Sequence, residues 1–357
     1  MTALEVATGP LLPAVSPDRD ASANRLLHLD PRRETLTDLG IDALASRLEP
    51  ADLVVVNDAA TLPASLRGTS SRGEVELRLC GVPPDGDGGR WQAVLFGAGS
   101  WRDRTEERPA PPRLGVGEAI EIARLGEADL TARVVSVSAV SPRLVELRFD
   151  LCGAPLWSAL YRLGRPVQYA HTRAPLALWD VQTAYAGRPL AAEMPSAGRP
   201  LRLPLLRALR SRRIALATVT HAAGLSSTGD PALDAALPLP ERSLLPASAV
   251  AAIECARRAG GRVLAVGTSV VRALEGAALD GPLRAGGSVR HERIGQGHQL
   301  RVVSGLLTGL HAPGESHFEL LQAFAPRALL ERALVHAGEA GYLGHEFGDS
   351  MLILPGG

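Results

Sequence analysis

The sequence predicts an α/β protein that carries a small antiparallel β-barrel inserted into its main domain. Buried-type strands alternate with helix-like segments in residues 1–63 and again in residues 154–357. Between them, residues 64–153 contain short strands of alternating polarity, separated by turn-rich joints and without helices. We therefore predict a discontinuous main domain, formed by the two flanks, and an inserted barrel domain, formed by residues 64–153.

The first flank is expected to supply a helix and then a buried strand. After a lead-in of residues 1–23, three apolar residues recur at helical spacing: Ile41, Leu44 and Leu48. Residues 52–56 read DLVVV, which is typical of a strand buried on both faces. This strand ends at Asn57 and Asp58, and ligands of α/β proteins bind at the carboxyl ends of strands.

Five short strands are expected inside the insertion, because apolar and polar residues alternate there. They cover residues 74–80, 91–96, 119–124, 130–137 and 144–149.

The second flank returns to alternating strands and helices. We expect a strand over residues 214–220, a helix over residues 246–259 and a strand over residues 263–266. Gly267 and Thr268 follow this last strand directly, and a helical pattern starts there with Thr268 as its expected cap. A helix start offers unpaired N–H groups, so this junction predicts a ligand site.

The remainder of the chain is expected to form a hairpin-like region, a turn, a helix and a final strand. The hairpin covers residues 287–303 and the turn covers residues 310–314. Ser316 and Glu319 form an S-x-x-E pattern, which predicts a capping box at the helix start. Residues 347–354 read as a polar turn that leads into an apolar strand.

The charge of the chain excludes a global attraction to nucleic acid. The 357 residues contain 38 basic and 38 acidic side chains, and every basic one is arginine. Six arginines nonetheless lie in a segment without Asp or Glu, and arginine forks suit phosphates: Arg199, Arg202, Arg207, Arg210, Arg212 and Arg213. A solvated helix face is the alternative explanation of this cluster.

The cysteines and the N-terminal sequence indicate a cytoplasmic protein. The three cysteines are far apart and lack CxxC spacing, which argues against a disulfide framework, and no cysteine cluster predicts a metal site. The first residues lack the basic segment of a signal peptide, and no apolar run approaches the ~20 residues that span a bilayer.

Six sequence blocks carry a resemblance to a known family, among them VGTSVVRALE and FGDSMLIL. The blocks cover residues 52–68, 181–186, 194–201, 266–275, 305–325 and 347–354. Their wording, order and spacing resemble the S-adenosylmethionine:tRNA ribosyltransferase-isomerases of queuosine biosynthesis. The resemblance covers roughly residues 24–354 and implies an α/β domain with an inserted β-barrel.

The resemblance implies an unusual reaction. The ribosyl part of S-adenosylmethionine is transferred to the aminomethyl group of a deazaguanine at the tRNA wobble position. The ribose rearranges to an epoxycyclopentane, which gives epoxyqueuosine while adenine and methionine leave. S-adenosylmethionine is then a co-substrate, tRNA the partner, no metal is required, and a monomer or weak homodimer is expected. Because a sulfonium acidifies the neighbouring C–H, the protein must supply a positioned base and hydrogen bonds to its substrates.

The matching blocks give the candidate site residues. His311 and Asp349 are the candidates for catalysis, and Asp349 has a turn-stabilising role as its alternative. The expected binding residues for S-adenosylmethionine or the acceptor base are Asn57, Asp58, Gln182, Thr183, Tyr185, Ser196, Gly198, His221, Gly267, Thr268, Arg272, Glu275 and Pro313. Arg272 and Glu275 are three residues apart on a helix, so a pair between them is the alternative for both.

Several positions differ from the family pattern. Ala59 and Ala60 stand in place of Thr-Arg, and residues 195–201 lack a histidine and an aromatic residue of the family. Glu241 is what remains of a His-x-Glu pair, and His221 matches a family histidine only with a shift of one residue. Two interpretations therefore stay open: a divergent tRNA ribosyltransferase-isomerase, or a paralogue that uses S-adenosylmethionine with another acceptor. A non-catalytic binding protein on the same fold is a third.

Overall fold

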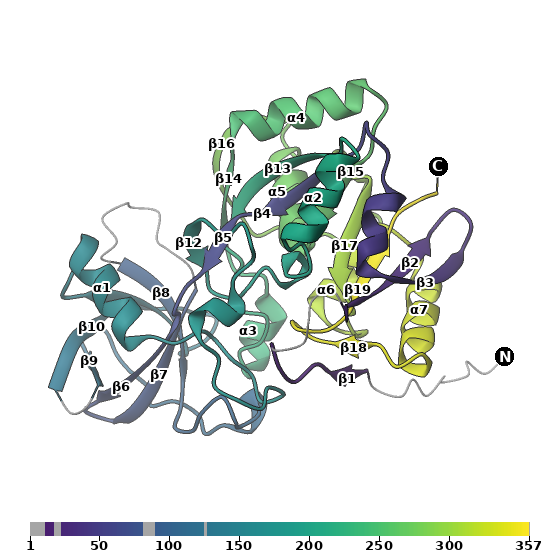
Figure 1. The fold of residues 1–357 in the computed structure, drawn as a ribbon. Coiled ribbons are helices and arrows are strands. Elements are labelled where there is room, and N and C mark those ends of the chain that lie inside the picture. The colour runs from purple at the N-terminus through teal and green to yellow at the C-terminus, as the bar shows by residue number, and fades with distance from the viewer. Residues whose placement is uncertain (1–10, 18–22, 81–89, 125–126, 357) are drawn as a thin grey trace.

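A computed structural model describes residues 11–17, 23–80, 90–124 and 127–356. The chain forms a closed β-barrel and a larger body around a nine-stranded sheet, as the two parts of the ribbon show (Figure 1). The α/β fold with a small antiparallel β-barrel that the sequence predicts is therefore confirmed. Among the helices in the described ranges, none combines the length and the apolar character that crossing a membrane requires.

The large sheet has the strand order β16-β14-β13-β4-β15-β17-β19-β2-β3. The strands are β2 (Arg25–Asp30), β3 (Thr35–Gly40), β4 (Leu53–Asn57), β13 (Ala215–His221), β14 (Glu241–Leu245), β15 (Val263–Val266), β16 (Gly286–Arg290), β17 (Gly305–Gly309) and β19 (Ser350–Ile353). Strands β13, β4, β15 and β17 are parallel neighbours, so their carboxyl ends meet at one edge. Strand β19 runs antiparallel to β17, and its first residue therefore lies at the same edge.

Alternate residues of the central strands face two separate cores, as the period of a strand requires. Leu53 and Val55 of β4 pack in one core, and Val54 and Val56 pack in the other. The first core lies under α4 (Ala247–Arg258), α5 (Thr268–Ala277), α6 (Ser316–Leu321) and α7 (Arg327–Glu339). The second core lies under α2 (Leu203–Ser211) and the 3₁₀ helix η2 (Ile41–Arg47). The first predicted helix thus exists, but as a 3₁₀ helix.

Shorter elements connect these layers. Two small parallel pairs join β1 (Leu12–Pro13) to β18 (Leu343–Gly344) and β5 (Ala59–Thr61) to β12 (Arg188–Ala191). Further short helical segments in the described residues are α3 (Pro231–Ala236) and the 3₁₀ turns η3 (Thr105–Glu107), η4 (Leu178–Val181) and η5 (Ser196–Gly198).

The barrel closes in the order β10-β11-β8-β7-β6-β9. Its strands are β6 (Ser65–Ser70), β7 (Gly73–Leu79), β8 (Arg90–Phe96), β9 (Ala119–Arg124), β10 (Glu127–Val137) and β11 (Leu144–Phe149). The sequence predicts five of these strands and misses β6, whose polar sequence hides it. Gly68 of β6 is in close contact with β9, because a Cβ there would lie 2.7 Å from Ile120 Cγ2.

Helix α1 (Gly153–Leu163) completes the core of the barrel. Leu156, Ala159 and Leu160 pack with the barrel interior, and the Trp157 ring lies edge-on to Trp91 with centroids 5.8 Å apart. The packed unit therefore extends past residue 153, where the sequence alone places the domain boundary.

Two local predictions are wrong. Strand β16 pairs with β14 instead of folding back as a hairpin over 287–303, and the described residues between 291 and 304 form no strand. The expected capping box at Ser316 is absent, because Glu315 occupies the cap position and Ser316 is the first helical residue.

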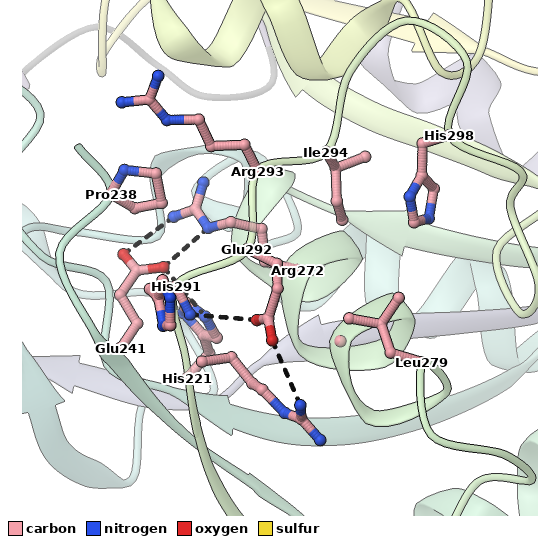
Figure 2. A pocket seen from close by; sticks show the side chains of 12 residues that line it. His221, Pro238, Glu241, Arg272, Leu279, His291, Glu292, Arg293, Ile294 and His298 are labelled. Carbon is pink, nitrogen blue, oxygen red and sulfur yellow. Dashed lines mark hydrogen bonds and ion pairs between the residues drawn. The ribbon is translucent and has the colours of Figure 1, made fainter. Parts of the chain in front are cut away.

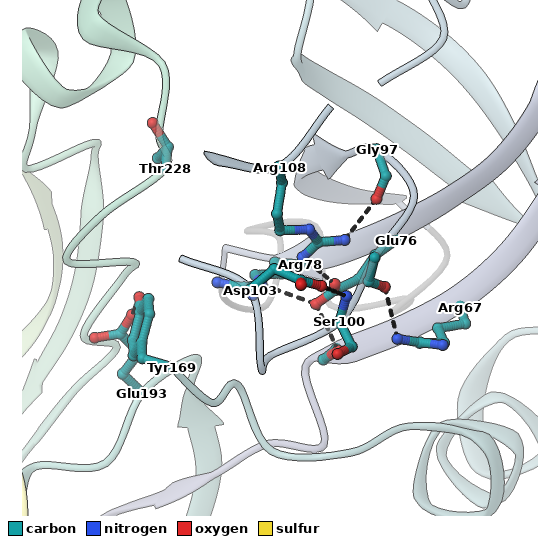
Figure 3. Close-up of polar contacts among 12 residues, drawn as sticks. Arg67, Glu76, Arg78, Gly97, Ser100, Asp103, Arg108, Tyr169, Glu193 and Thr228 are labelled. Atoms are coloured by element: carbon teal, nitrogen blue, oxygen red, sulfur yellow. Dashed lines mark hydrogen bonds and ion pairs between the residues drawn. The ribbon is translucent and has the colours of Figure 1, made fainter. Parts of the chain in front are cut away.

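A buried ion cluster lies where the barrel meets the α/β body (Figure 3). Glu76 Oε1 accepts a hydrogen bond from Arg78 Nε at 2.8 Å, and Glu76 Oε2 accepts one from Arg108 Nη1 at 2.5 Å. The Arg78 guanidinium also lies 5.3 Å from the centre of the Tyr169 ring, which belongs to the α/β body. Burial alone raises the pKa of Glu76, but the two arginines outweigh it and lower that pKa to about 2.

Replacing Glu76 tests this cluster. We expect Glu76→Gln to lower the free energy of unfolding by about 3 kcal/mol or more, because two buried guanidiniums lose their counter-charge. Glu146→Gln is the matched control in the same barrel, since Glu146 forms an exposed pair with Arg90, and it is expected to change little. Chemical denaturation measures both.

The same cluster predicts a pH dependence. Because the folded-state pKa of Glu76 is lowered from 4.5 to about 2, its stabilisation is complete above pH 4.5 and is lost as the pH falls toward 2. The gap in stability between the native protein and Glu76→Gln should therefore narrow over that range. A gap that is no larger than that of Glu146→Gln would contradict the role of Glu76.

Candidate active site at the carboxyl edge of the sheet

The carboxyl ends of the four parallel strands bring most of the predicted site residues together. Strand β4 ends at Asn57, β13 ends at His221, β15 is followed by Gly267, and β17 is followed by the turn that contains His311. Gly309, the last residue of β17, pairs with Ser350, so Asp349 lies at this edge as well.

The buried Asn57 side chain connects neighbouring segments at this edge of the sheet by hydrogen bonds. Its Oδ1 accepts hydrogen bonds from the backbone N–H groups of Ala59 at 3.0 Å and His221 at 2.9 Å. Its Nδ2 donates to the His221 carbonyl at 2.9 Å and to Ser269 Oγ at 3.3 Å. Both polar atoms of this buried side chain are thus engaged by the protein, which favours a structural role over contact with a substrate.

Three further candidate residues lie near Asn57: Asp58, Gln182 and Thr183. Asp58 Oδ1 accepts a hydrogen bond from Thr220 Oγ1 at 2.6 Å. The Gln182 amide pairs with Thr61 as a neighbouring strand would, through two hydrogen bonds of 3.0 Å with the backbone N–H and carbonyl. Thr183 is buried, and its Oγ1 has no hydrogen-bond partner, so it remains a candidate for binding.

Ser196, Gly198 and Tyr185 form a tight loop against the start of α5. Gly267, at φ +91°, packs on Ala197, because a Cβ at Gly267 would lie 3.4 Å from Ala197 Cβ. A Cβ at Gly198 would lie 2.0 Å from Tyr185 Oη, so the tyrosine ring leaves room only for glycine there. Tyr185 Oη donates to the Gly198 carbonyl at 3.3 Å, and burial raises the pKa of this phenol. Ser196 is half-buried.

The start of α5 differs from the prediction. Thr268 is the first helical residue and not the cap, which is Gly267, and no side chain caps this helix end. Glycine occupies this position because its positive φ is strained for any other residue. Thr268 is buried beneath the turn.

Arg272, Glu241 and His221 form a buried polar cluster beside a cavity of about 110 Å³ (Figure 2). Arg272 holds the Glu241 carboxylate with two hydrogen bonds, of 2.8 Å from Nε and 3.0 Å from Nη2. His221 Nε2 lies 3.3 Å from the same carboxylate, while His221 Nδ1 is buried without a hydrogen-bond partner. The Gly224 N–H also donates to Glu241 at 3.0 Å.

The charges of this cluster are fixed by burial and pairing. Burial raises the pKa of Glu241, but Arg272 and His221 outweigh it, so that pKa lies below its usual range. Burial lowers the pKa of His221 to about 4, although Glu241 partly opposes this effect. The imidazole is therefore neutral near pH 7, with its Nε2 facing the carboxylate.

Glu275 does not pair with Arg272, so that alternative is wrong. Its carboxylate is fully buried and accepts backbone hydrogen bonds from Arg301 at 2.8 Å and from Val302 and Val303 at 2.9 Å. His298, at the far end of the cavity from Glu241 in Figure 2, lies 3.5 Å from Glu275. Glu275 thus holds the chain that replaces the predicted hairpin.

The sequence analysis names Glu241 as the remnant of a His-x-Glu pair but does not count it among the candidate site residues, although a signal is present. Glu241, Ser243 and Leu245 are the buried positions of β14, so the carboxylate lies on the same strand face as an apolar residue. An acidic residue on the buried face of a strand must find a charged partner. Arg272 is that partner.

His311 lies in the turn after β17 with three polar or aromatic neighbours. Its Nε2 is 3.0 Å from Thr308 Oγ1, and its Nδ1 is 3.6 Å from Glu315 Oε2. The His317 ring stacks on it with centroids 4.9 Å apart, and burial holds the pKa of His317 well below its ordinary value. His317 is therefore a neutral, half-buried neighbour of His311.

Asp349 is buried and bound by backbone groups. Its Oδ1 accepts a hydrogen bond from the Arg25 N–H and its Oδ2 accepts one from the Leu343 N–H, both at 2.8 Å. These contacts join the turn before β19 to the first residue of β2. The structure therefore favours the turn-stabilising alternative over catalysis for Asp349.

The remaining candidate residues, Pro313 and the six arginines, differ in solvent exposure. Pro313 is exposed in the turn after His311. Arg199 is buried, donates to the Pro17 carbonyl and lies 5.1 Å above the centre of the Phe347 ring, so its guanidinium is engaged within the protein and its phosphate role stays a prediction. The other five arginines are exposed on or beside α2: Arg202, Arg207, Arg210, Arg212 and Arg213.

Comparisons with known proteins agree with this architecture. Residues 9–353 match the family described as queuosine biosynthesis protein. A relative from Anaeromyxobacter dehalogenans, named S-adenosylmethionine:tRNA ribosyltransferase-isomerase, is 36% identical over 98% of this chain and 95% of its own. A relative of the same name from Methylocella silvestris is 34% identical over 96% of this chain and 94% of its own.

A solved structure shares the fold. The S-adenosylmethionine tRNA ribosyltransferase of Thermotoga maritima is 21% identical, with a TM-score of 0.52 over 97% of this chain and 99% of its own. Three features together define the class of protein: an α/β body, an inserted barrel, and polar side chains at the carboxyl ends of the parallel strands. The chain belongs to the queuosine biosynthesis protein family.

The buried histidine predicts a loss of stability in acid. His221 has a folded-state pKa of about 4 and an unfolded-state value of 6.5, so only the unfolded chain takes up a proton between these values. The free energy of unfolding should fall as the pH drops from 6.5 to 4, by an amount on the order of 3 kcal/mol for this residue alone.

Replacing His221 isolates the contribution of its imidazole to this pH dependence of stability. We expect His221→Gln to lose less stability than the native protein over this pH range, as measured by denaturant titrations at each pH. Identical pH profiles for the two proteins would show that His221 is not held neutral by burial.

Proposed function

We propose that this protein transfers and isomerises the ribosyl part of S-adenosylmethionine onto 7-aminomethyl-7-deazaguanine at the tRNA wobble position. The product is epoxyqueuosine, and adenine and methionine leave. The observation that carries the proposal is the 36% identity to a relative of that name over nearly the whole chain, inserted barrel included.

His311 is the proposed acid–base group. Its ring is half-buried at the strand edge, so a substrate can reach it, and Thr308 and Glu315 contact its two nitrogens. The Glu315 carboxylate lies beside the ring and can pair with the imidazolium that forms when the ring removes a proton from a carbon next to a sulfonium.

His221 and Arg272 are the proposed binding groups of the same edge. His221 Nδ1 has no partner within the protein, and its ring is oriented by Glu241. A neutral imidazole with one nitrogen held by a carboxylate offers the other as a hydrogen-bond acceptor for a hydroxyl or amino group. Thr183 Oγ1, also unpartnered, is the second such group.

The exposed arginines of α2 are proposed to contact tRNA phosphates. Leu205 and Leu209 bury the other face of this helix in the core, while Arg207 and Arg210 point away from it and remain exposed. Guanidiniums without buried partners are free to pair with phosphate oxygens.

A different acceptor is the second candidate function. Ala59 and Ala60, which replace a hydroxyl and a guanidinium of the family pattern, lie in β5 directly after Asn57 and Asp58. Their methyl groups cannot make the polar contacts that those side chains would offer, which favours a changed acceptor contact.

Adenine release tests the proposed reaction. The purified protein should release adenine when it is incubated with S-adenosylmethionine and tRNA that carries the aminomethyl-deazaguanine. His311→Gln should reduce turnover by about a hundredfold or more, because it removes the acid–base group and keeps the side-chain size. His336→Gln is the control, since His336 lies half-exposed on α7, pairs with Asp38 and is not a candidate site residue, so it should leave turnover unchanged.

The outcomes separate the alternatives. Without adenine release from the native protein, the proposed reaction fails. Calorimetric titration with S-adenosylmethionine then distinguishes a paralogue with another acceptor, which binds it, from a protein that does not use it. Unchanged turnover in His311→Gln would remove His311 from the mechanism.

Salt dependence tests the tRNA surface. Arg207→Gln with Arg210→Gln should weaken tRNA binding and reduce the slope of log K against log salt by about 0.7–0.9 per lost phosphate contact. The double variant Arg257→Gln, Arg258→Gln is the matched control, because these exposed arginines lie on α4, which covers the opposite face of the sheet. Equal slopes for both double variants would contradict a specific role for α2.

A further inference from the structure

Three donor side chains converge next to the candidate site from distant parts of the chain. The ligand atoms of His171, His345 and Glu346 all lie within 4.8 Å of one another. The two imidazole rings are stacked with centroids 4.3 Å apart, and His171 Nε2 lies 2.9 Å from Glu346 Oε2. We propose that these three residues bind a divalent transition-metal ion of the zinc class.

The turn that carries His345 and Glu346 is fixed by its own hydrogen bonds. The Leu343 carbonyl accepts a bond from the Asp349 N–H at 2.8 Å, and the Asp349 carboxylate accepts one from the Leu343 N–H at 2.8 Å. The His345 carbonyl accepts one from the Gly348 N–H at 3.0 Å. His345 itself has φ +63°, an unusual conformation for a residue other than glycine or asparagine. The backbone thus holds this imidazole over His171.

The loop that carries His171 is fixed as well. Gln168 Nε2 donates to Thr172 Oγ1 and to the Ala174 carbonyl, each at 2.6 Å, and Gln168 Oε1 accepts from the Leu176 N–H at 3.0 Å. Thr172 Oγ1 donates to the Tyr169 carbonyl at 2.9 Å. Donors on two pre-organised segments bind an ion with little loss of conformational entropy.

The donor set indicates the class of ion. Two imidazoles and one carboxylate suit zinc, and in tetrahedral sites with three protein ligands the fourth position is open to water or substrate. Zinc–ligand bonds of about 2.0–2.2 Å place the donor atoms of a tetrahedral site about 3.4 Å apart, so the His171–Glu346 pair, now 2.9 Å apart, would separate slightly and donor atoms up to 4.8 Å apart would approach by side-chain rotation. His345 is exposed, so an ion can enter from solvent.

The ion would join two segments far apart in sequence. It would tie the loop after α1 to the turn before β19, beside the turn that carries Glu315 and His311, whose charges act on His345. A hydrogen bond between His171 and Glu346, with His345 merely stacked on it, is the alternative. This alternative predicts no dependence on metal, so the two are separable.

Metal binding to the full-length protein without a polyhistidine tag tests the proposal. After removal of metal with a chelator, Zn²⁺ should bind with a 1:1 stoichiometry in calorimetry and raise the melting temperature. Co²⁺ at the same site should show the strong visible absorption of a four-coordinate complex.

Matched variants locate the ion. His171→Ala and Glu346→Gln each remove one donor and should weaken Zn²⁺ binding by about a hundredfold or more. His345→Asn removes the imidazole but tolerates the positive φ, so it should fold and lose the ion. His336→Ala should bind Zn²⁺ as the native protein does, because His336 has one acidic partner, Asp38.

Two results would overturn the proposal. One is the absence of 1:1 binding in the native protein. The other is binding that persists in folded His171→Ala and His345→Asn, since the ion would then lie elsewhere. The test does not depend on the proposed transferase reaction, because its readouts are binding, melting temperature and absorption.

Discussion

The antiparallel pairing of β19 with β17 is the constraint on which this edge of the molecule depends. Four parallel strands end there, and β19 begins there because Ser350 pairs with Gly309. The turn before β19 therefore lies beside the turn that carries His311. Asp349 secures this arrangement, because its buried carboxylate accepts backbone hydrogen bonds from both Arg25 and Leu343. A single side chain thus holds β2, β19 and the turn between β18 and β19 in one register.

The polar side chains at the edge fall into two groups. Asn57, Gln182, Glu275 and Asp349 have their polar atoms bound by the backbone, so they fix loops and strand ends. His221 and Thr183 instead keep a buried polar atom without a partner. A buried polar atom left unpaired costs about 1–3 kcal/mol unless a ligand or water satisfies it. At this edge, the unpaired atoms rather than the bound ones are therefore those that we propose for contact with a substrate.

The sequence predicts what local patterns encode. Alternating apolar residues give the strands of the barrel and the central sheet, because a strand buried on one or both faces has a clear period. Strand β6 has no such period, and the hairpin over 287–303 fails because Glu275, distant in sequence, holds that chain by three backbone hydrogen bonds. The sequence likewise selects His311 and Arg272 as candidates, but it cannot show that Arg272 pairs with Glu241 and that Arg199 is buried. Partners across the fold decide these roles, and spacing along the chain carries no information on them.

The convergence of His171 with His345 and Glu346 also depends on contacts across the fold and not on spacing along the chain. Metal-ligand motifs are recognisable when two or more ligands lie on one helix or turn with regular spacing, and here only the adjacent pair His345 and Glu346 does. The third donor, His171, lies beside this pair because the chain after α1 returns to the edge of the sheet at which β19 begins.

The two histidines of the candidate site, His221 and His311, differ in burial and in their neighbouring carboxylates, and this difference separates their proposed roles. His221 is almost fully buried, and burial outweighs the attraction of Glu241, because Arg272 already neutralises that carboxylate. The pKa of about 4 makes His221 a weak base but a dependable neutral hydrogen-bond group. His311 is half-buried, and Glu315, the carboxylate beside it, has a half-exposed side chain and no arginine bound to it among the described contacts. His311 therefore lies beside a carboxylate that is open to solvent, whereas His221 lies beside a carboxylate that Arg272 already neutralises. Proton transfer at this edge is thus expected at His311, and recognition of a fixed hydroxyl or amino group at His221.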